Sequence, residues 1–139
     1  MKLTDKVALI TGGKRLGAAV AEALAARGMD VALSYSRSRA EAEEAAAKVR
    51  ASGRRAEVIH ADLAQADACD ALVRDVAGRL GALDLLINMA SVYVQKPFDD
   101  MRVAEWDATL DVDLRAAFLC ARAAVPEMRK RGGGRIINF

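Results

Sequence analysis

Histidine, cysteine and aromatic residues are scarce in this sequence. Its 139 residues include one histidine and two cysteines, and aromatic residues make up 4% of the total. Cys69 and Cys120 lack both the close spacing of a metal site and the pairs of a disulfide framework, so buried free thiols are the favoured interpretation. The lone His60 ends a predicted strand, which indicates a structural role. The sequence therefore offers neither a metal centre nor a Ser/His/Asp triad.

The sequence also has little excess charge and no long hydrophobic run. Its net charge of +2 is too small to indicate binding to nucleic acid or to a membrane surface. Residues 1–6 are polar and do not contain the apolar segment of a signal peptide. No apolar run approaches the length of a transmembrane helix. We therefore expect a cytoplasmic protein with neither nucleic-acid nor membrane partners.

What the sequence does contain is a regular alternation of predicted strands and helices. Hydrophobic residues make up 53% of the chain, and the length suits one domain over residues 1–139. Short apolar runs predict strands, and amphipathic stretches closed by glycine predict helices. The predicted strands are residues 7–10, 31–35, 56–60, 83–88 and 135–139, and the predicted helices are residues 16–27, 39–52, 67–80 and 103–131.

The spacing of these elements predicts the topology. Repeated β-α-β units of this length indicate a parallel sheet with right-handed crossovers. We expect an α/β protein with a Rossmann-type doubly wound sheet, strand order 3-2-1-4-5, truncated after strand 5. A ligand of such a sheet binds at the carboxyl ends of strands 1 and 4, where the strand order reverses. The residues after these two strands are therefore the first candidates for a site.

A glycine-rich turn follows the first predicted strand. Gly12, Gly13 and Gly17 are spaced Gly-Gly-x-x-x-Gly, which differs from the strict Gly-x-Gly-x-x-Gly dinucleotide fingerprint. The next helix directs its free N–H groups and positive dipole end at this turn, and Lys14 and Arg15 add two cations, which favours a phosphate. A tight turn into a packed helix is the alternative interpretation. Because the polar segment after strand 4 reaches the same crevice, a ligand site is favoured.

The end of the second predicted strand indicates which nucleotide binds. NAD-binding domains carry an acid there, which bonds the ribose 2′-hydroxyl. This chain has no acid at that point and has Ser36, Arg37 and Ser38 instead. An arginine pairs with a 2′-phosphate through its forked donors, so the sequence predicts NADP(H) as the cofactor. Two alternatives stay open, because Ser38 can cap the next helix and Arg37 can be a solvated loop charge.

Together these motifs resemble the short-chain dehydrogenase/reductase family over the whole chain. The residues that carry the resemblance are Thr11-Gly12, Asp62-Leu63, Asn88-x-Ala90-Ser91 and Arg135-Ile-Ile-Asn138. Within the family, the chain is most similar to the pteridine-reductase-like branch, through Lys14-Arg15-Leu16-Gly17, Ser36-Arg37-Ser38 and Ala90-Ser91. The resemblance implies an NADPH-dependent reductase that transfers a hydride to a small-molecule substrate with a carbonyl or a pterin-like C=N bond.

The resemblance also implies roles for individual residues. Those expected at the pyrophosphate and ribose are Gly12, Lys14, Arg15 and Leu16. Those expected at the 2′-phosphate are Ser36, Arg37 and Ser38. Those expected at the adenine are Asp62 and Leu63, and those at the ribose between the two halves are Asn88 and Ala90. Those expected beside the substrate are Ser91 and Tyr93, although a loop anchor is the favoured interpretation of the tyrosine.

Four features depart from the family pattern. The glycine turn is one residue shorter than usual, and Met89 replaces the second Asn of the usual Asn-Asn-Ala-Gly. Asp113 stands where the family has an Asn that holds a water of the proton relay, which makes it the one catalytic candidate, with a helix-surface acid as the alternative. The family's catalytic Ser follows strand 5, and this sequence ends there at Phe139. The family's Tyr-x-x-x-Lys is also missing, because neither Tyr35 nor Tyr93 is followed by a lysine four residues later.

We therefore expect the cofactor-binding part of a longer reductase. Ile136 and Ile137 on the last predicted strand would form an apolar edge, which proteins normally cover. The helix over residues 103–131 is apolar on nearly all sides in its middle, and in this family it packs against its own copy, so we expect a homo-oligomer through this helix. A complete non-catalytic NADP(H)-binding or oligomer-capping module is the alternative, and a decayed product that does not fold stably is a third.

Overall fold

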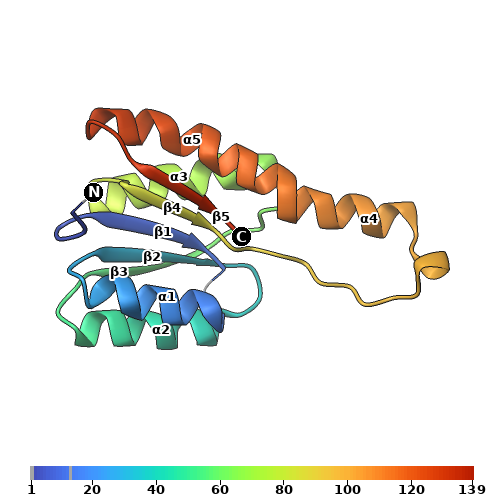
Figure 1. The fold of residues 1–139 in the computed structure, drawn as a ribbon, viewed down its shortest axis with the longest axis horizontal. Coiled ribbons are helices and arrows are strands. Elements are labelled where there is room, and N and C mark those ends of the chain that lie inside the picture. Colours follow the sequence, from blue (N-terminus) through green and yellow to red (C-terminus); the bar gives the residue numbers. More distant parts are fainter. Residues whose placement is uncertain (1, 13) are drawn as a thin grey trace.

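A five-stranded parallel sheet forms the centre of the computed structural model, which describes residues 2–12 and 14–139 (Figure 1). Its order, β3-β2-β1-β4-β5, confirms the predicted topology. The strands are β1 (Val7–Thr11), β2 (Asp30–Tyr35), β3 (Ala56–His60), β4 (Leu85–Asn88) and β5 (Arg135–Asn138). Because all neighbouring pairs are parallel, the carboxyl ends of the five strands meet at one edge of the sheet.

Helices cover both faces of the sheet. The helices α1 (Leu16–Ala25) and α2 (Arg39–Ala51) lie on one face, while α3 (Ala66–Leu80) and α5 (Ala116–Lys130) lie on the other (Figure 1). β1 is an uninterrupted apolar run because its alternate side chains enter two separate cores. One core joins Val7 and Leu9 to α3 and α5, and the other joins Ala8 and Ile10 to α1 and α2.

The predicted helix over residues 103–131 is not one continuous α-helix, and the prediction is wrong in this respect. A π-helical segment, η2 (Asp111–Arg115), joins α4 (Val103–Leu110) to α5, and a short 3-10 helix, η1 (Phe98–Asp100), precedes α4. A π turn accommodates one extra residue and shifts the side chains around the helix axis. Amphipathic periodicity could not reveal it, because the residues of η2 take part in contacts with a segment far away in the sequence. The other predicted bounds agree with the structure within two residues.

Two further expectations from the sequence are confirmed. Cys69 and Cys120 are free thiols and are buried in the core beneath α3 and α5. β5 lies at the edge of the sheet, where Ile137 and Phe139 are 44% and 75% exposed.

Within the described residues, no helix has the length and apolar character to span a membrane. The same part of the chain contains no cluster of three or more histidine, cysteine or acidic side chains that could hold a metal ion.

A buried carboxylate, Asp84, lies at the amino-terminal edge of the sheet, opposite the edge where a ligand is expected. It accepts hydrogen bonds from Lys6 Nζ at 2.8 Å and from the Val7 N–H at 3.0 Å, and Arg131 Nε lies 3.6 Å away. Burial raises the pKa of Asp84, but these hydrogen bonds and the two cations outweigh it and lower the pKa below its usual value. The network holds β1, β4 and the end of α5 together.

Candidate nucleotide-binding site

A groove of about 840 Å³ lies at the carboxyl edge of the sheet, which is within the usual size of a ligand cleft. Its lining brings together most of the predicted site residues, namely Gly12, Lys14, Arg15, Ser36, Arg37, Ser38, Asp62, Leu63, Ala90, Ser91 and Tyr93. As far as the described residues form it, the lining does not include Leu16, Asn88 or Asp113. Gly13, the middle glycine of the predicted turn, lies outside the described residues.

The two described glycines of the turn are required by different constraints. Gly12 has a φ of +86°, and a Cβ there would lie 3.3 Å from the Met89 carbonyl oxygen after β4. At Gly17, in the first turn of α1, a Cβ would lie 2.1 Å from the Gly12 carbonyl oxygen. The first glycine thus permits the backbone turn, and the second lets the helix begin directly against it. The glycines therefore form a tight turn that packs against the start of α1, as the alternative interpretation of the sequence expects. Gly12 also lines the groove.

The substitution Gly17→Ala is expected to destabilise the fold by about 1–3 kcal/mol and to weaken nucleotide binding, because the new methyl group overlaps the Gly12 carbonyl. Gly78→Ala is the matched control, since Gly78 also lies in a helix and has open space around its Cβ position. That control is expected to gain about 0.5–1 kcal/mol from helix propensity. Urea unfolding of both variants measures the difference, and equal effects of the two substitutions would contradict the packing argument.

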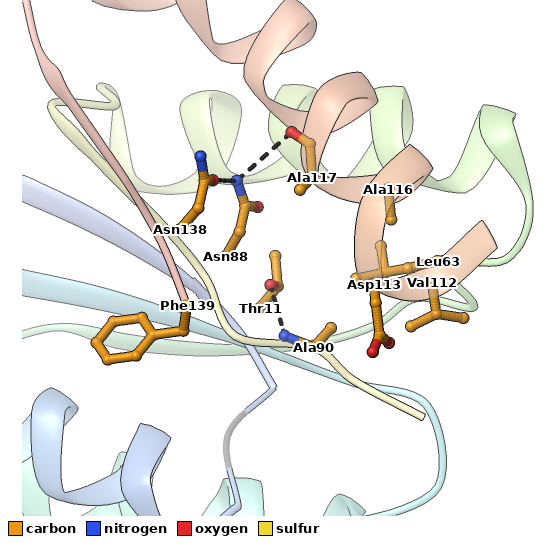
Figure 2. Close-up of a pocket in the computed structure, with 10 residues that line it drawn as sticks. All are labelled: Thr11, Leu63, Asn88, Ala90, Val112, Asp113, Ala116, Ala117, Asn138 and Phe139. Carbon is orange, nitrogen blue, oxygen red and sulfur yellow. Dashed lines mark hydrogen bonds between the residues drawn. The ribbon is translucent and has the colours of Figure 1, made fainter. Parts of the chain in front are cut away.

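Thr11 at the end of β1 is a positioning residue that the sequence reasoning left out of the site. Its side chain is buried, and its Oγ1 accepts hydrogen bonds from the Met89 N–H at 3.0 Å and the Ala90 N–H at 3.2 Å. Figure 2 shows the second of these bonds. One hydroxyl therefore fixes the chain after β4 against β1, where the strand order reverses. Its position at the end of a buried apolar strand was the available signal, because a lone hydroxyl there needs a partner.

Cations gather where the groove passes the ends of β1 and β2. Lys14, Arg15 and Arg37 line it, and Lys14 Nζ lies 3.6 Å from Glu41 Oε1 on α2. Arg15 occupies the N-cap of α1 with a φ of +49° and provides no side-chain acceptor for the helix. The N-terminus of α1 therefore has a cation where an acceptor usually stands, which favours an anion at this point.

The segment after β2 exposes its polar side chains to the groove. Ser36 and Arg37 are exposed, and among residues 2–12 and 14–139 no carboxylate oxygen lies within 4 Å of the Arg37 guanidinium. Ser38 stands at the N-cap position of α2, but its side chain makes no capping hydrogen bond. The capping alternative for this serine is therefore not what the structure shows. The donor set, two hydroxyl groups and a guanidinium beside a basic turn, fits a phosphate ester.

Asn88 is buried under the groove and lines a small cavity of about 20 Å³ (Figure 2). Its Nδ2 donates to Asn138 Oδ1 on β5 at 2.8 Å and to the Ala117 carbonyl of α5 at 3.5 Å. Its Oδ1 accepts no hydrogen bond from the described part of the chain. The amide side chain therefore joins β4 to β5 and α5, and its expected role at the ribose stays a prediction.

Asp113 lies in the π-helical turn η2 and binds the segment that follows β4. Its carboxylate accepts hydrogen bonds from the Ser91 hydroxyl at 3.0 Å and the Val92 N–H at 2.9 Å. Asp113 also lines the small cavity beside Asn88. These bonds attach the wall of the groove to the helix, which is a positioning role, and the predicted catalytic role stays a prediction.

The remaining predicted residues differ in how far they reach the groove. Tyr93 lines the groove and is 83% exposed, so the tyrosine does not anchor the loop by burial. Asp62 Oδ1 accepts a hydrogen bond from the Ala64 N–H, which shapes the turn after β3. Leu63 is buried at the groove floor, and Leu16 is 56% exposed in the first turn of α1.

The comparison with known proteins agrees with this fold. Residues 6–139 match the family described as short chain dehydrogenase, so the chain belongs to that family of oxidoreductases. It is 37% identical over 138 residues to a 3-oxoacyl-(acyl-carrier-protein) reductase of Synechocystis sp.. The aligned region covers 99% of this chain and 56% of the relative.

Two solved structures of such enzymes contain NADP. A short chain dehydrogenase from Burkholderia cenocepacia in complex with NADP is 41% identical with a TM-score of 0.87, over 91% of this chain and 52% of that one. A metagenomic short-chain oxidoreductase in complex with NADP is 36% identical with a TM-score of 0.89, over 99% of this chain and 63% of that one. The chain spans about half the length of the curated relatives it matches.

Proposed function

We propose that this chain is the cofactor-binding part of an NADPH-dependent short-chain reductase. The observation that carries the proposal is the serine and arginine segment after β2, which lines the groove and contains no acid. Ser36, Arg37 and Ser38 would hold the 2′-phosphate, because a guanidinium and hydroxyl groups donate to all its oxygens. The two related structures that contain NADP support this choice of nucleotide.

The other groove residues would hold the rest of the cofactor. Lys14, Arg15 and the N-terminus of α1 would meet the pyrophosphate, with Gly12 leaving room for it. Asp62 and Leu63 would lie at the adenine, and Ala90 would lie at the ribose between the two halves. The bound cofactor supplies a hydride to the substrate.

We propose a carbonyl compound as the substrate class, held near Ser91 and Tyr93. The name of the Synechocystis relative specifies a 3-oxoacyl group, which supports a carbonyl over a C=N bond. The exposed ring of Tyr93 supports the pterin-like alternative, since a planar heterocycle can stack on it. Because the chain has no Tyr-x-x-x-Lys sequence, we expect no turnover by these 139 residues alone.

Self-association is part of the proposal. Several large apolar side chains of α4, η2 and α5 are exposed, namely Val103, Trp106, Leu114 and Phe118. Exposed apolar residues that follow one helical stretch are typical of an interface between subunits. We propose that a homo-oligomer forms through residues 103–131. We also propose that the protein lies in the cytoplasm, as the sequence predicts.

Calorimetric titration of the 139-residue chain with NADPH and with NADH tests the proposed function. We expect weak binding overall, with NADPH preferred by about tenfold or more, because a charge-assisted phosphate contact contributes about 1.5–3 kcal/mol. Similar affinities for the two nucleotides would reject NADP(H) as the cofactor. Absence of binding to either nucleotide would overturn the proposed cofactor role of these residues.

A further inference from the structure

One carboxylate outside the groove lining pairs with a cation of the groove. Glu41 stands in the first turn of α2, three residues after Ser38, and its Oε1 is 3.6 Å from Lys14 Nζ on the turn after β1. Within the described residues, Glu41 is the one acid within 4 Å of a cation that lines the groove, because Arg15 and Arg37 have no carboxylate partner there. The pair therefore crosses from α2 to the glycine turn.

This pair has little value for the stability of the fold. Both side chains are about half exposed, at 54% for Lys14 and 45% for Glu41, and ion pairs of this kind contribute little to folding. The same carboxylate has a larger effect on an incoming anion. It neutralises Lys14 and occupies the positive end of the α2 dipole, so a phosphate that approaches Lys14 must compete with it.

We propose that Glu41 is a specificity-determining residue that weakens the affinity of the groove for a 2′-phosphate by competing for Lys14. The inference rests on the proposed function and adds the 2′-phosphate to the groups that Lys14 would meet, because the pair with Glu41 holds Lys14 Nζ beside the first turn of α2, which follows Ser38 directly. The phosphate must displace the Glu41 carboxylate from Lys14 before it can bind there. This competition weakens binding at a groove that has three cations in its lining, Lys14, Arg15 and Arg37. Removing its charge therefore tightens binding of a nucleotide that has a 2′-phosphate more than binding of one that lacks it.

The test compares adenosine 2′,5′-bisphosphate with 5′-AMP in calorimetric titrations of the wild-type chain and of Glu41→Gln. We expect the bisphosphate to bind about 3- to 10-fold more tightly to the variant, and 5′-AMP to bind both proteins within about twofold. Glu43→Gln is the matched control, because Glu43 lies on the same helix and pairs with Arg50 instead. That control is expected to change neither affinity. In a Lys14→Met background, the gain from Glu41→Gln is expected to shrink.

Each outcome decides between the two proposals. An unchanged or weakened preference for the bisphosphate in Glu41→Gln overturns the inference, while the proposed function stands if the wild-type chain still prefers the bisphosphate. A wild-type chain that binds both probes equally overturns the phosphate assignment and the role of Glu41 with it. An equal gain in Glu43→Gln shows a general charge effect and also overturns the inference.

Discussion

Replacing Arg37 with glutamate is expected to weaken NADPH binding by about 100-fold while NADH binding stays within about twofold. The variant loses charge-assisted hydrogen bonds to the 2′-phosphate, which contribute about 1.5–3 kcal/mol, and it adds repulsion by a carboxylate. The arginine is exposed on the groove wall and has no acidic partner among the described residues, so its removal leaves no other group unpaired. Calorimetric titration with both nucleotides measures the ratio of the two affinities.

The neighbouring Arg39 provides the matched control for this substitution. Arg39 is the first residue of α2 and is exposed, and it is not part of the groove lining. Arg39→Glu makes the same change of charge two residues away, so it reports the effect of net charge alone. We expect it to weaken NADPH binding by no more than about threefold through screened long-range electrostatics. Equal losses in the two variants would mean that Arg37 makes no specific contact with the phosphate.

Replacing Asp84 with alanine is expected to lower the free energy of unfolding by about 3 kcal/mol and the melting temperature by roughly 10 °C. The carboxylate is buried, and its loss leaves the Val7 N–H without an acceptor and two cations without their partner. Thermal and urea unfolding at pH 7 measure both quantities. Asp75→Ala, which breaks an exposed pair with Arg79 on α3, serves as the control and is expected to cost less than about 0.5 kcal/mol.

The pH dependence of unfolding gives a second measurement of the same network. Because the pKa of Asp84 is lowered in the folded state, its charge stabilises the fold above the unfolded pKa of about 3.9. That contribution is lost as the pH falls through the lower folded pKa, where the side chain becomes protonated. The difference in stability between the wild-type chain and Asp84→Ala is therefore expected to narrow below about pH 4. A constant difference down to pH 2 would show that packing, and not charge, is what the alanine removes.

Most of the fold could be predicted from the sequence because it is encoded locally. The run from Val7 to Ile10 is wholly apolar since both faces of β1 are covered, and glycines close the helices where the chain turns. The handedness of β-α-β units then leaves a single order for the five strands. The same topology brings Gly12 and Arg37 to one edge of the sheet, which is why the groove could be anticipated.

The contacts inside the site were not predictable in this way. Asp113 meets Ser91 across 22 positions of sequence, and Asn88 meets Asn138 across 50. Neither pair leaves a periodic signal, because each is selected by the three-dimensional approach of a strand end to a distant helix or strand. The π-helical turn at Asp113 has the same origin, since it accompanies these long-range contacts and not a local propensity.

The sequence by itself determined the doubly wound sheet, the family and the basic, serine-containing segment that faces the groove, since hydrophobic period, glycine and charge act over a few residues. Only the tertiary structure decided which polar side chains meet. It placed Asn88 under the groove, made Asp113 and Thr11 fasten the chain after β4, and set Glu41 against Lys14. Hydrogen bonds and ion pairs depend on distance and direction between groups that the chain brings together only when the sheet has formed.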